Sequence, residues 1–257
     1  MSEIITLLAC LNPVLSYTLT RQLACITEAM LAMSGRVTML GLYQSTSQGG
    51  SYRTIQRFFS TQLNWPLIRW LFVRSHLRDK NDIILIAGDE VNVTKSGKKT
   101  YGIGRFFSSL YGKAVPSLYF LNLSLVSVKN RRSSPIIMEQ VMPDVMKSSK
   151  NQKKSIQKTK KSEKTKPGRP EGSKNKNRKE VELSKYLQFV QTTLKSLLNL
   201  VNTDISLIYF VFDGAFGNND ALQMVRQCEL HLISKMRHDS ALYLPYTGKY
   251  SGRGPRQ

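Results

Sequence analysis

Two apolar stretches, IILIAGD at 83–89 and LIYFVFD at 207–213, decide the fold of this chain. Each is a short, mainly apolar run, as in strands buried on both faces of a parallel sheet, and each ends in an aspartate. A carboxylate at such a place is costly to desolvate unless a donor or a cation compensates its charge. Either aspartate alone is also an ordinary cap for a following turn or helix. The pair predicts a divalent-metal site at Asp89 and Asp213.

The elements around these strands predict how the two aspartates meet. The periodicity of the apolar residues predicts three strands, a helix, a strand, a helix and a strand, at 82–89, 105–111, 117–128, 183–201, 206–213, 218–227 and 229–236. Short connections make the first three strands an antiparallel meander, and a helical crossover makes the fourth strand parallel to the first. This α/β order is the ribonuclease H-like arrangement. It would set the first and fourth strands side by side, with Asp89 facing Asp213.

A small helical domain is predicted ahead of this sheet. Apolar residues recur at three- and four-residue spacing along 19–33, a second helix is predicted to begin near Ser51, and a third covers 66–77. Arg53 and Arg57 would lie on the outward face of the second helix. Two interpretations stay open: a helix-turn-helix-like DNA-binding domain and a plain helical bundle.

The positive net charge indicates which kind of molecule the protein binds. The chain of 257 residues has a net charge of +21, and residues 147–180 contain 14 Lys/Arg against 3 Asp/Glu, which leaves +10 for the rest. Such an excess favours DNA or another polyanion over a merely solubilising surface. The run at 147–180 has almost no apolar residues and is predicted to be a disordered insertion. It would interrupt an incomplete catalytic domain at 81–257, which follows the helical DNA-binding domain at 1–80.

The cysteines and the lengths of the apolar runs indicate the cellular compartment. The three cysteines have no metal-ligand spacing, and no apolar run approaches the roughly 18 residues needed to span a bilayer. We therefore expect a cytoplasmic, nucleoid-associated protein with no membrane partner and no small-molecule substrate. The two aspartates supply hard oxygen ligands, which suit Mg²⁺ or Mn²⁺. Two such ions can activate the attacking oxygen and stabilise the leaving oxygen of a phosphodiester.

Three motifs carry a resemblance to a known family. The segments GDEVNVTKSGKKTYGIGRFFSSLYGK (88–113), SLYFLNLSLVSVK (117–129) and FVFDGAFGNND (210–220) resemble DDE transposases of bacterial insertion sequences. The resemblance implies that Asp89 and Asp213 are catalytic metal ligands, with Glu90 as the alternative first ligand. It also implies homo-oligomers on DNA and a third acid on a helix beyond the fifth strand. No such helix is predicted before Gln257, so the chain is expected to be a C-terminally truncated form.

Basic residues supply candidate DNA contacts outside the helical domain. Around the first aspartate these are Lys95, Lys98, Lys99, Arg105 and Lys113. In the insertion, the segment KPGRPEGSK (166–174) resembles an AT-hook, in which an extended arginine enters a narrow minor groove. Lys166, Arg169 and Lys174 would make those contacts. The alternative is a basic loop that binds phosphates without sequence preference.

Three functions fit these observations. The first is a metal-dependent transposase that binds element ends and, in complete form, cleaves and joins DNA. The second is a truncated, non-catalytic DNA-binding protein that regulates or inhibits transposition. The third is a structure-specific nuclease on the same fold. In each case Tyr101, Phe106 and Phe107 are expected to be core residues and not base-stacking groups.

Overall fold

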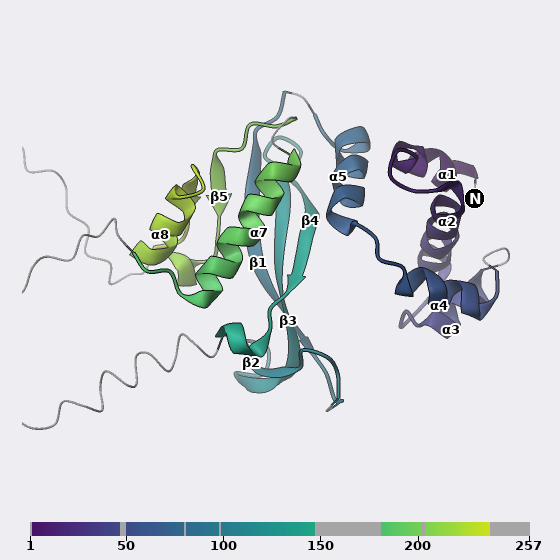
Figure 1. The fold of residues 1–257 in the computed structure, drawn as a ribbon, viewed down its shortest axis with the longest axis horizontal. Helices are drawn as coiled ribbons and strands as arrows, with labels where there is room; N and C mark the ends of the chain where they lie inside the picture. The colour runs from purple at the N-terminus through teal and green to yellow at the C-terminus, as the bar shows by residue number, and fades with distance from the viewer. Residues whose placement is uncertain are drawn as a thin grey trace, which may run out of the picture.

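A computed structural model of the chain describes residues 2–46, 50–79, 81–97, 99–146, 181–201 and 204–236. Helices form its N-terminal part, and a mixed sheet with further helices forms the rest (Figure 1). The N-terminal elements are α1 (Ser2–Leu8), the short helix η1 (Ala9–Leu11), α2 (Tyr17–Ala32), α3 (Met39–Ser45), α4 (Tyr52–Ser60) and α5 (Trp65–His76). None of the helices in the described ranges is both long enough and apolar enough to cross a membrane.

The described strands form one mixed sheet. They are β1 (Ile84–Thr94), β2 (Gly104–Ser108), β3 (Lys113–Ser127), β4 (Arg132–Gln140), β5 (Tyr209–Val211) and β6 (His231–Ile233). The strand order is β2-β3-β1-β5-β6, and β4 also pairs with β3. β1 is antiparallel to β3 and parallel to β5. The α/β, ribonuclease H-like fold with a helical N-terminal part is confirmed, including the parallel pairing of β1, which contains Asp89, with β5, which Asp213 follows.

The predicted meander differs in detail from the observed one. The strand predicted at 105–111 is the short β2, which pairs only with the first residues of β3. The third strand of the meander is β4, which the sequence did not predict. It begins with Arg132, Ser133 and Ser134, and it contains Pro135, which has no N–H to donate to a ladder. The described structure places it at an edge, opposite a register shift between Leu123 and Ser124, where a proline is tolerated.

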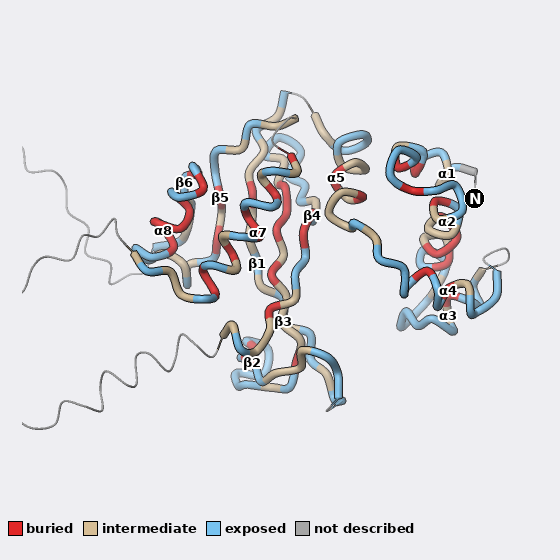
Figure 2. Tube along the Cα trace, viewed as in Figure 1, coloured by how far each residue is buried: buried red, intermediate tan, exposed pale blue. Residues whose placement is uncertain are grey.

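One face of the sheet carries the main core. The helix α7 (Lys185–Val201) packs on the sheet against β3 and β4, and its apolar face is buried (Figures 1 and 2). The 3₁₀ helix η2 (Gly214–Phe216) and α8 (Asn219–Arg226) follow β5. Asn218 caps α8, because its side chain accepts from the amide of Ala221 at 3.0 Å. Fully buried residues of this core include Ile86, Leu121, Leu123, Leu194, Leu197, Phe210 and Met224.

Helix α5 connects the helical part to the sheet. Ile68 packs with the N-terminal helices, whereas Trp70, on the same helix, belongs to the core of the sheet. The guanidinium of Arg69 donates to the carbonyl of Ile136 at 3.2 Å, which satisfies part of the free edge of β4. The division at 80/81 stays a prediction, and α5 is the element through which the two parts contact each other.

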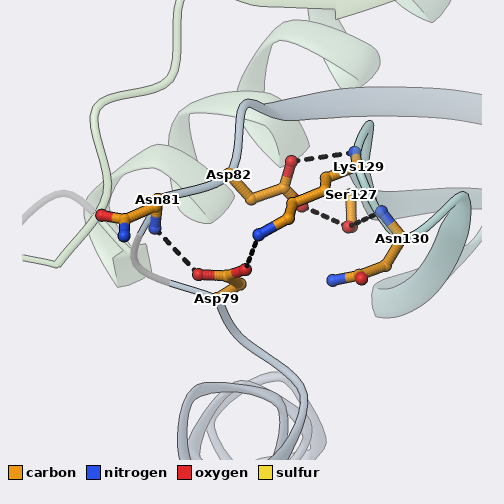
Figure 3. A network of polar contacts seen from close by, with 6 residues as sticks. All are labelled: Asp79, Asn81, Asp82, Ser127, Lys129 and Asn130. Atoms are coloured by element: carbon orange, nitrogen blue, oxygen red, sulfur yellow. Dashed lines mark hydrogen bonds and ion pairs between the residues drawn. The ribbon is translucent and has the colours of Figure 1, made fainter.

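A polar network fixes the start of β1 at the end of the sheet far from Asp89 (Figure 3). Asp82 accepts from the hydroxyl of Ser127 and from the amide of Lys129, the latter at 2.9 Å. Asp79 accepts from the ammonium of Lys129 at 2.8 Å. The hydrogen bond from Ser127 lowers the pKa of Asp82, and that from Lys129 lowers the pKa of Asp79. The network ties the segment after α5 to the turn between β3 and β4.

We expect Leu194→Ala to lower the free energy of unfolding by about 2–5 kcal/mol, because Leu194 is fully buried between α7 and the sheet. Urea denaturation of the full chain measures the loss. The exposed neighbour Lys195→Ala is the control and should change stability by less than about 0.5 kcal/mol. Equal effects of the two substitutions would contradict the assignment of α7 to the core.

Candidate metal centre

The register of the parallel strands β1 and β5 places Asp89 and Asp213 opposite each other. In the parallel pair of β1 and β5, Ile86 lies opposite Phe210 and Ala87 opposite Val211. Continued for two more residues, the same register sets Asp89 opposite Asp213. Both side chains are exposed. The sheet therefore places the two carboxylates side by side. Asp213 follows the end of β5, whereas β1 continues past Asp89 to Thr94, so the prediction that the first strand ends at Asp89 was wrong.

Each aspartate also makes a local backbone contact. The Oδ1 atom of Asp89 accepts from the amide of Glu90 at 2.8 Å. The Oδ1 atom of Asp213 accepts from the amide of Gly214, at the start of η2. The capping role considered for a single strand-end aspartate is thus real at Asp213. It involves Oδ1, and it orients the carboxylate at the strand end.

Glu90 has a different environment from Asp89. Successive side chains of a strand point to opposite faces, so Glu90 shares the face of Ile86, which α7 covers. Its carboxylate accepts from the hydroxyls of Tyr119 on β3 and Tyr186 on α7, one at each oxygen. Burial, reinforced by the neighbouring Glu90 carboxylate, raises the pKa of both tyrosines above the ordinary range. Glu90 is therefore held by two neutral donors on the core side of the sheet.

A cleft of about 940 Å³ opens beside these acids. Asp89 and Asp213 line it together with the connection between β2 and β3, and Glu90 borders it as well. Arg105 is the basic residue of its lining. The cleft is thus acidic at Asp89 and Asp213 and basic at Arg105 on the hairpin side.

Comparison with known proteins places this site in a family. A family model described as DDE superfamily endonuclease matches residues 7–257. The chain belongs to the DDE superfamily endonucleases. The predicted resemblance to DDE proteins is confirmed at that level. No curated protein matches this endonuclease-family chain.

This DDE superfamily chain is also similar to a solved structure. That structure is the Drosophila P element transposase strand transfer complex, with 12% sequence identity and a TM-score of 0.37. The match covers 87% of this chain and 46% of that chain, so this chain spans less than half the length of its structural relative.

DDE endonucleases generally use divalent ions, and the acids present fit part of such a site. Asp89 and Asp213 offer hard carboxylate oxygens at one open edge of the sheet, as Mg²⁺ or Mn²⁺ requires. Within the described ranges, no group of three or more His, Cys, Asp or Glu side chains is close enough to hold a metal. Asp89 and Asp213 therefore stay a predicted pair of metal ligands.

The structure separates the predicted DNA-binding residues into three groups. Lys95, Lys99, Arg105 and Lys113 lie on or beside the hairpin near the acids, and all but the half-buried Lys95 are exposed. Arg53 and Arg57 lie on the exposed face of α4, in the helical part and away from the cleft. The predicted residues Lys98, Lys166, Arg169 and Lys174 lie outside the described residues.

The two tyrosines around Glu90 were not predicted from the sequence. Tyr186 is 96 residues from Glu90, and no local pattern connects them. The one signal was strand alternation, which sets Glu90 on the buried face where a carboxylate needs donors. The expectation that Tyr101 and Phe107 are core residues was wrong, since both are exposed, whereas Phe106 is buried as expected.

We expect Tyr186→Phe to change the alkaline stability of the protein. A tyrosine whose pKa is raised by folding contributes stability below its ordinary pKa of about 10 and loses it as pH rises further, by at most about 1.4 kcal/mol per pH unit. Phenylalanine cannot ionise, so the fall above pH 10 should be shallower, from a starting stability lower by about 1–3 kcal/mol. Urea denaturation at several pH values measures both. Tyr17→Phe is the control, because Tyr17 is exposed. If stability fell equally steeply with pH in Tyr186→Phe and in wild type, the burial of Tyr186 against Glu90 would be contradicted.

Proposed function

We propose that this chain is a DDE transposase polypeptide that binds DNA and contributes Asp89 and Asp213 to a metal-dependent centre for cleavage and strand transfer. The observation that supports this function is the register of β1 and β5, which sets two exposed carboxylates at one level. The family match supports endonuclease chemistry, and the net charge of +21 supports a polyanionic substrate. Insertion-sequence DNA is the substrate that the sequence motifs imply.

Each acidic or basic residue of the cleft would have a role that follows from its position. Asp89 and Asp213 would hold Mg²⁺ or Mn²⁺, which supplies the charge that activates an attacking oxygen and stabilises a leaving oxygen. Arg105, on the wall of the same cleft, would hold a phosphate of the strand to be cut. Glu90, with one tyrosine hydroxyl at each carboxylate oxygen, would fix the end of β1 against α7 and so keep Asp89 directed outward.

DNA contacts away from the cleft would come from two other regions. Arg53 and Arg57 are exposed on α4, whose buried face holds Ile55 and Phe58, so this helix presents its basic side outward. We assign end binding to this helical part and backbone or A·T-tract binding to the basic insertion at 147–180. Copies of the chain would assemble on the two ends of an element.

A second function is supported by one observation. Among the described residues, no group of three or more His, Cys, Asp or Glu could hold a metal, and Glu90 is engaged by two tyrosine hydroxyls. A centre of two carboxylates would bind a metal weakly, and the chain would then act as a DNA-binding regulator that competes for element ends. Metal binding and DNA binding, measured separately, distinguish the two functions.

We expect Asp213→Asn and Asp89→Asn each to weaken Mn²⁺ binding at least about tenfold, because each removes a charged oxygen ligand. Titration calorimetry with Mn²⁺ measures the change. DNA affinity at modest salt should be nearly unchanged, since neither substitution removes a basic residue. Glu90→Gln is the matched control, and its Mn²⁺ affinity should stay within about threefold of wild type. Loss of binding in Glu90→Gln but not in Asp89→Asn would make Glu90 the first ligand, and the absence of any Mn²⁺ binding would leave only the regulator function.

We expect deletion of residues 150–179 to reduce the salt dependence of DNA affinity. The logarithmic slope should become less negative by about 0.9 for each phosphate that the shortened chain no longer neutralises. Any preference for A·T tracts over G·C duplexes should weaken in parallel. Fluorescence anisotropy over a range of salt concentrations measures both quantities. An unchanged slope would remove the insertion from the proposed DNA interface.

A further inference from the structure

The end of β2 and its connection to β3 carry large apolar side chains that are exposed to solvent. Leu110 is 83% exposed, Phe107 is 67% exposed and Tyr111 is 52% exposed. We call these three residues the hairpin tip. Tight connections between strands usually expose Gly, Asn, Asp or Ser, so an exposed Leu-Tyr pair is unusual there. Exposed apolar groups clustered in this way indicate a surface that binds something.

The hairpin tip is held in a fixed place beside the acidic pair. Phe106, which alternates with Phe107, is buried and stacks on the ring of Tyr119 with centroids 4.9 Å apart. The side-chain amide of Asn92, on β1, donates to the carbonyl of Phe107 at 2.9 Å. All three residues of the hairpin tip line the same cleft as Asp89 and Asp213. The apolar groups are therefore part of the wall of the candidate centre.

Charge indicates what this surface binds. No Asp or Glu occurs between Glu90 and Glu139, while this stretch includes Lys99, Arg105 and Lys113 on or near the hairpin. Such a surface repels another copy of a chain whose net charge is +21 and attracts a polyanion. Paired DNA alone would require only the basic residues, since the faces of stacked bases are covered. Exposed aromatic rings add a group that stacks on bases that are not covered.

We propose that the hairpin tip binds unpaired bases of the DNA strand whose phosphate Arg105 would hold beside Asp89 and Asp213. This inference rests on the proposed function, because it places the bases of the same DNA strand. Tyr111 and Phe107 would stack on bases displaced from the duplex. Leu110 would enter between base steps, as apolar side chains do when they unstack DNA. The basic residues of the hairpin would hold the backbone of that strand.

The test compares two DNA probes with the full chain and no divalent metal. One probe is a fully paired duplex, and the other is the same duplex with a few unpaired bases at one end. Tyr111→Ala and Phe107→Ala should weaken binding of the frayed probe by about five- to hundredfold, which is the range for removal of one base stack. Binding of the paired probe should change by less than about twofold.

Two further variants distinguish ring stacking from simple apolar contact. Tyr111→Trp keeps a ring and should bind the frayed probe like wild type, whereas Tyr111→Leu keeps apolar area without a ring and should bind it like Tyr111→Ala. Ile83→Ala is the matched control, because Ile83 is exposed at the start of the first strand and outside the cleft lining. It should leave both affinities unchanged.

Other results would overturn the inference in distinguishable ways. Wild-type protein that binds both probes equally, or variants that lose both equally, would make the hairpin tip a general DNA contact or none. Variants that lose self-association in sedimentation but keep DNA affinity would make it an interface between copies. Wild-type protein that binds neither probe would contradict the proposed function itself.

Discussion

The parallel pairing of β1 with β5 is the constraint on which the candidate site depends. Ile86 and Phe210 are paired and fully buried, and the ring of Phe210 lies where a side chain at Gly88 would be, 2.9 Å from its Cβ position. A larger residue at 88 would push the strands apart, and a slip of one residue would turn every side chain to the other face. The register of Asp89 and Asp213 is thus fixed by apolar packing at the residue pairs that precede them.

The contrast between Asp89 and Glu90 follows from the same alternation. Two acids adjacent in sequence are sent to opposite faces, and the faces differ in what covers them. On the face covered by α7, a carboxylate must be satisfied by donors, and two tyrosines from different elements provide them. At the exposed position, the Asp89 carboxylate faces the cleft. Glu90, held by two tyrosine hydroxyls, and Asp89, which faces the cleft, can therefore be neighbours in sequence and have different roles.

Features that depend on residues close together in the chain could be predicted from the sequence, and features that depend on the packing of distant elements could not. The apolar runs that end at Asp89 and Asp213 are continuous. The two strands, their parallel pairing and the position of the two aspartates opposite each other could therefore be predicted. β4 was missed because Pro135 and its polar start suit an edge strand, and the edge is recognised only once β3 and α5 are in place. The tyrosines around Glu90 and the exposure of Phe107 depend on which elements pack together. Those relations join residues far apart in the chain and have no local pattern.

The distribution of charge completes the physical picture of the cleft. The carboxylates of Asp89 and Asp213 repel a phosphate, and the basic hairpin beside them attracts it. DNA attracted by Arg105 and its neighbours would stop short of the acids unless a cation lay between them. A divalent ion removes that repulsion and adds a large positive charge at the acids themselves. The basic hairpin and the acidic pair are thus complementary only through a metal, which is why metal affinity, more than DNA affinity, decides between an enzyme and a regulator.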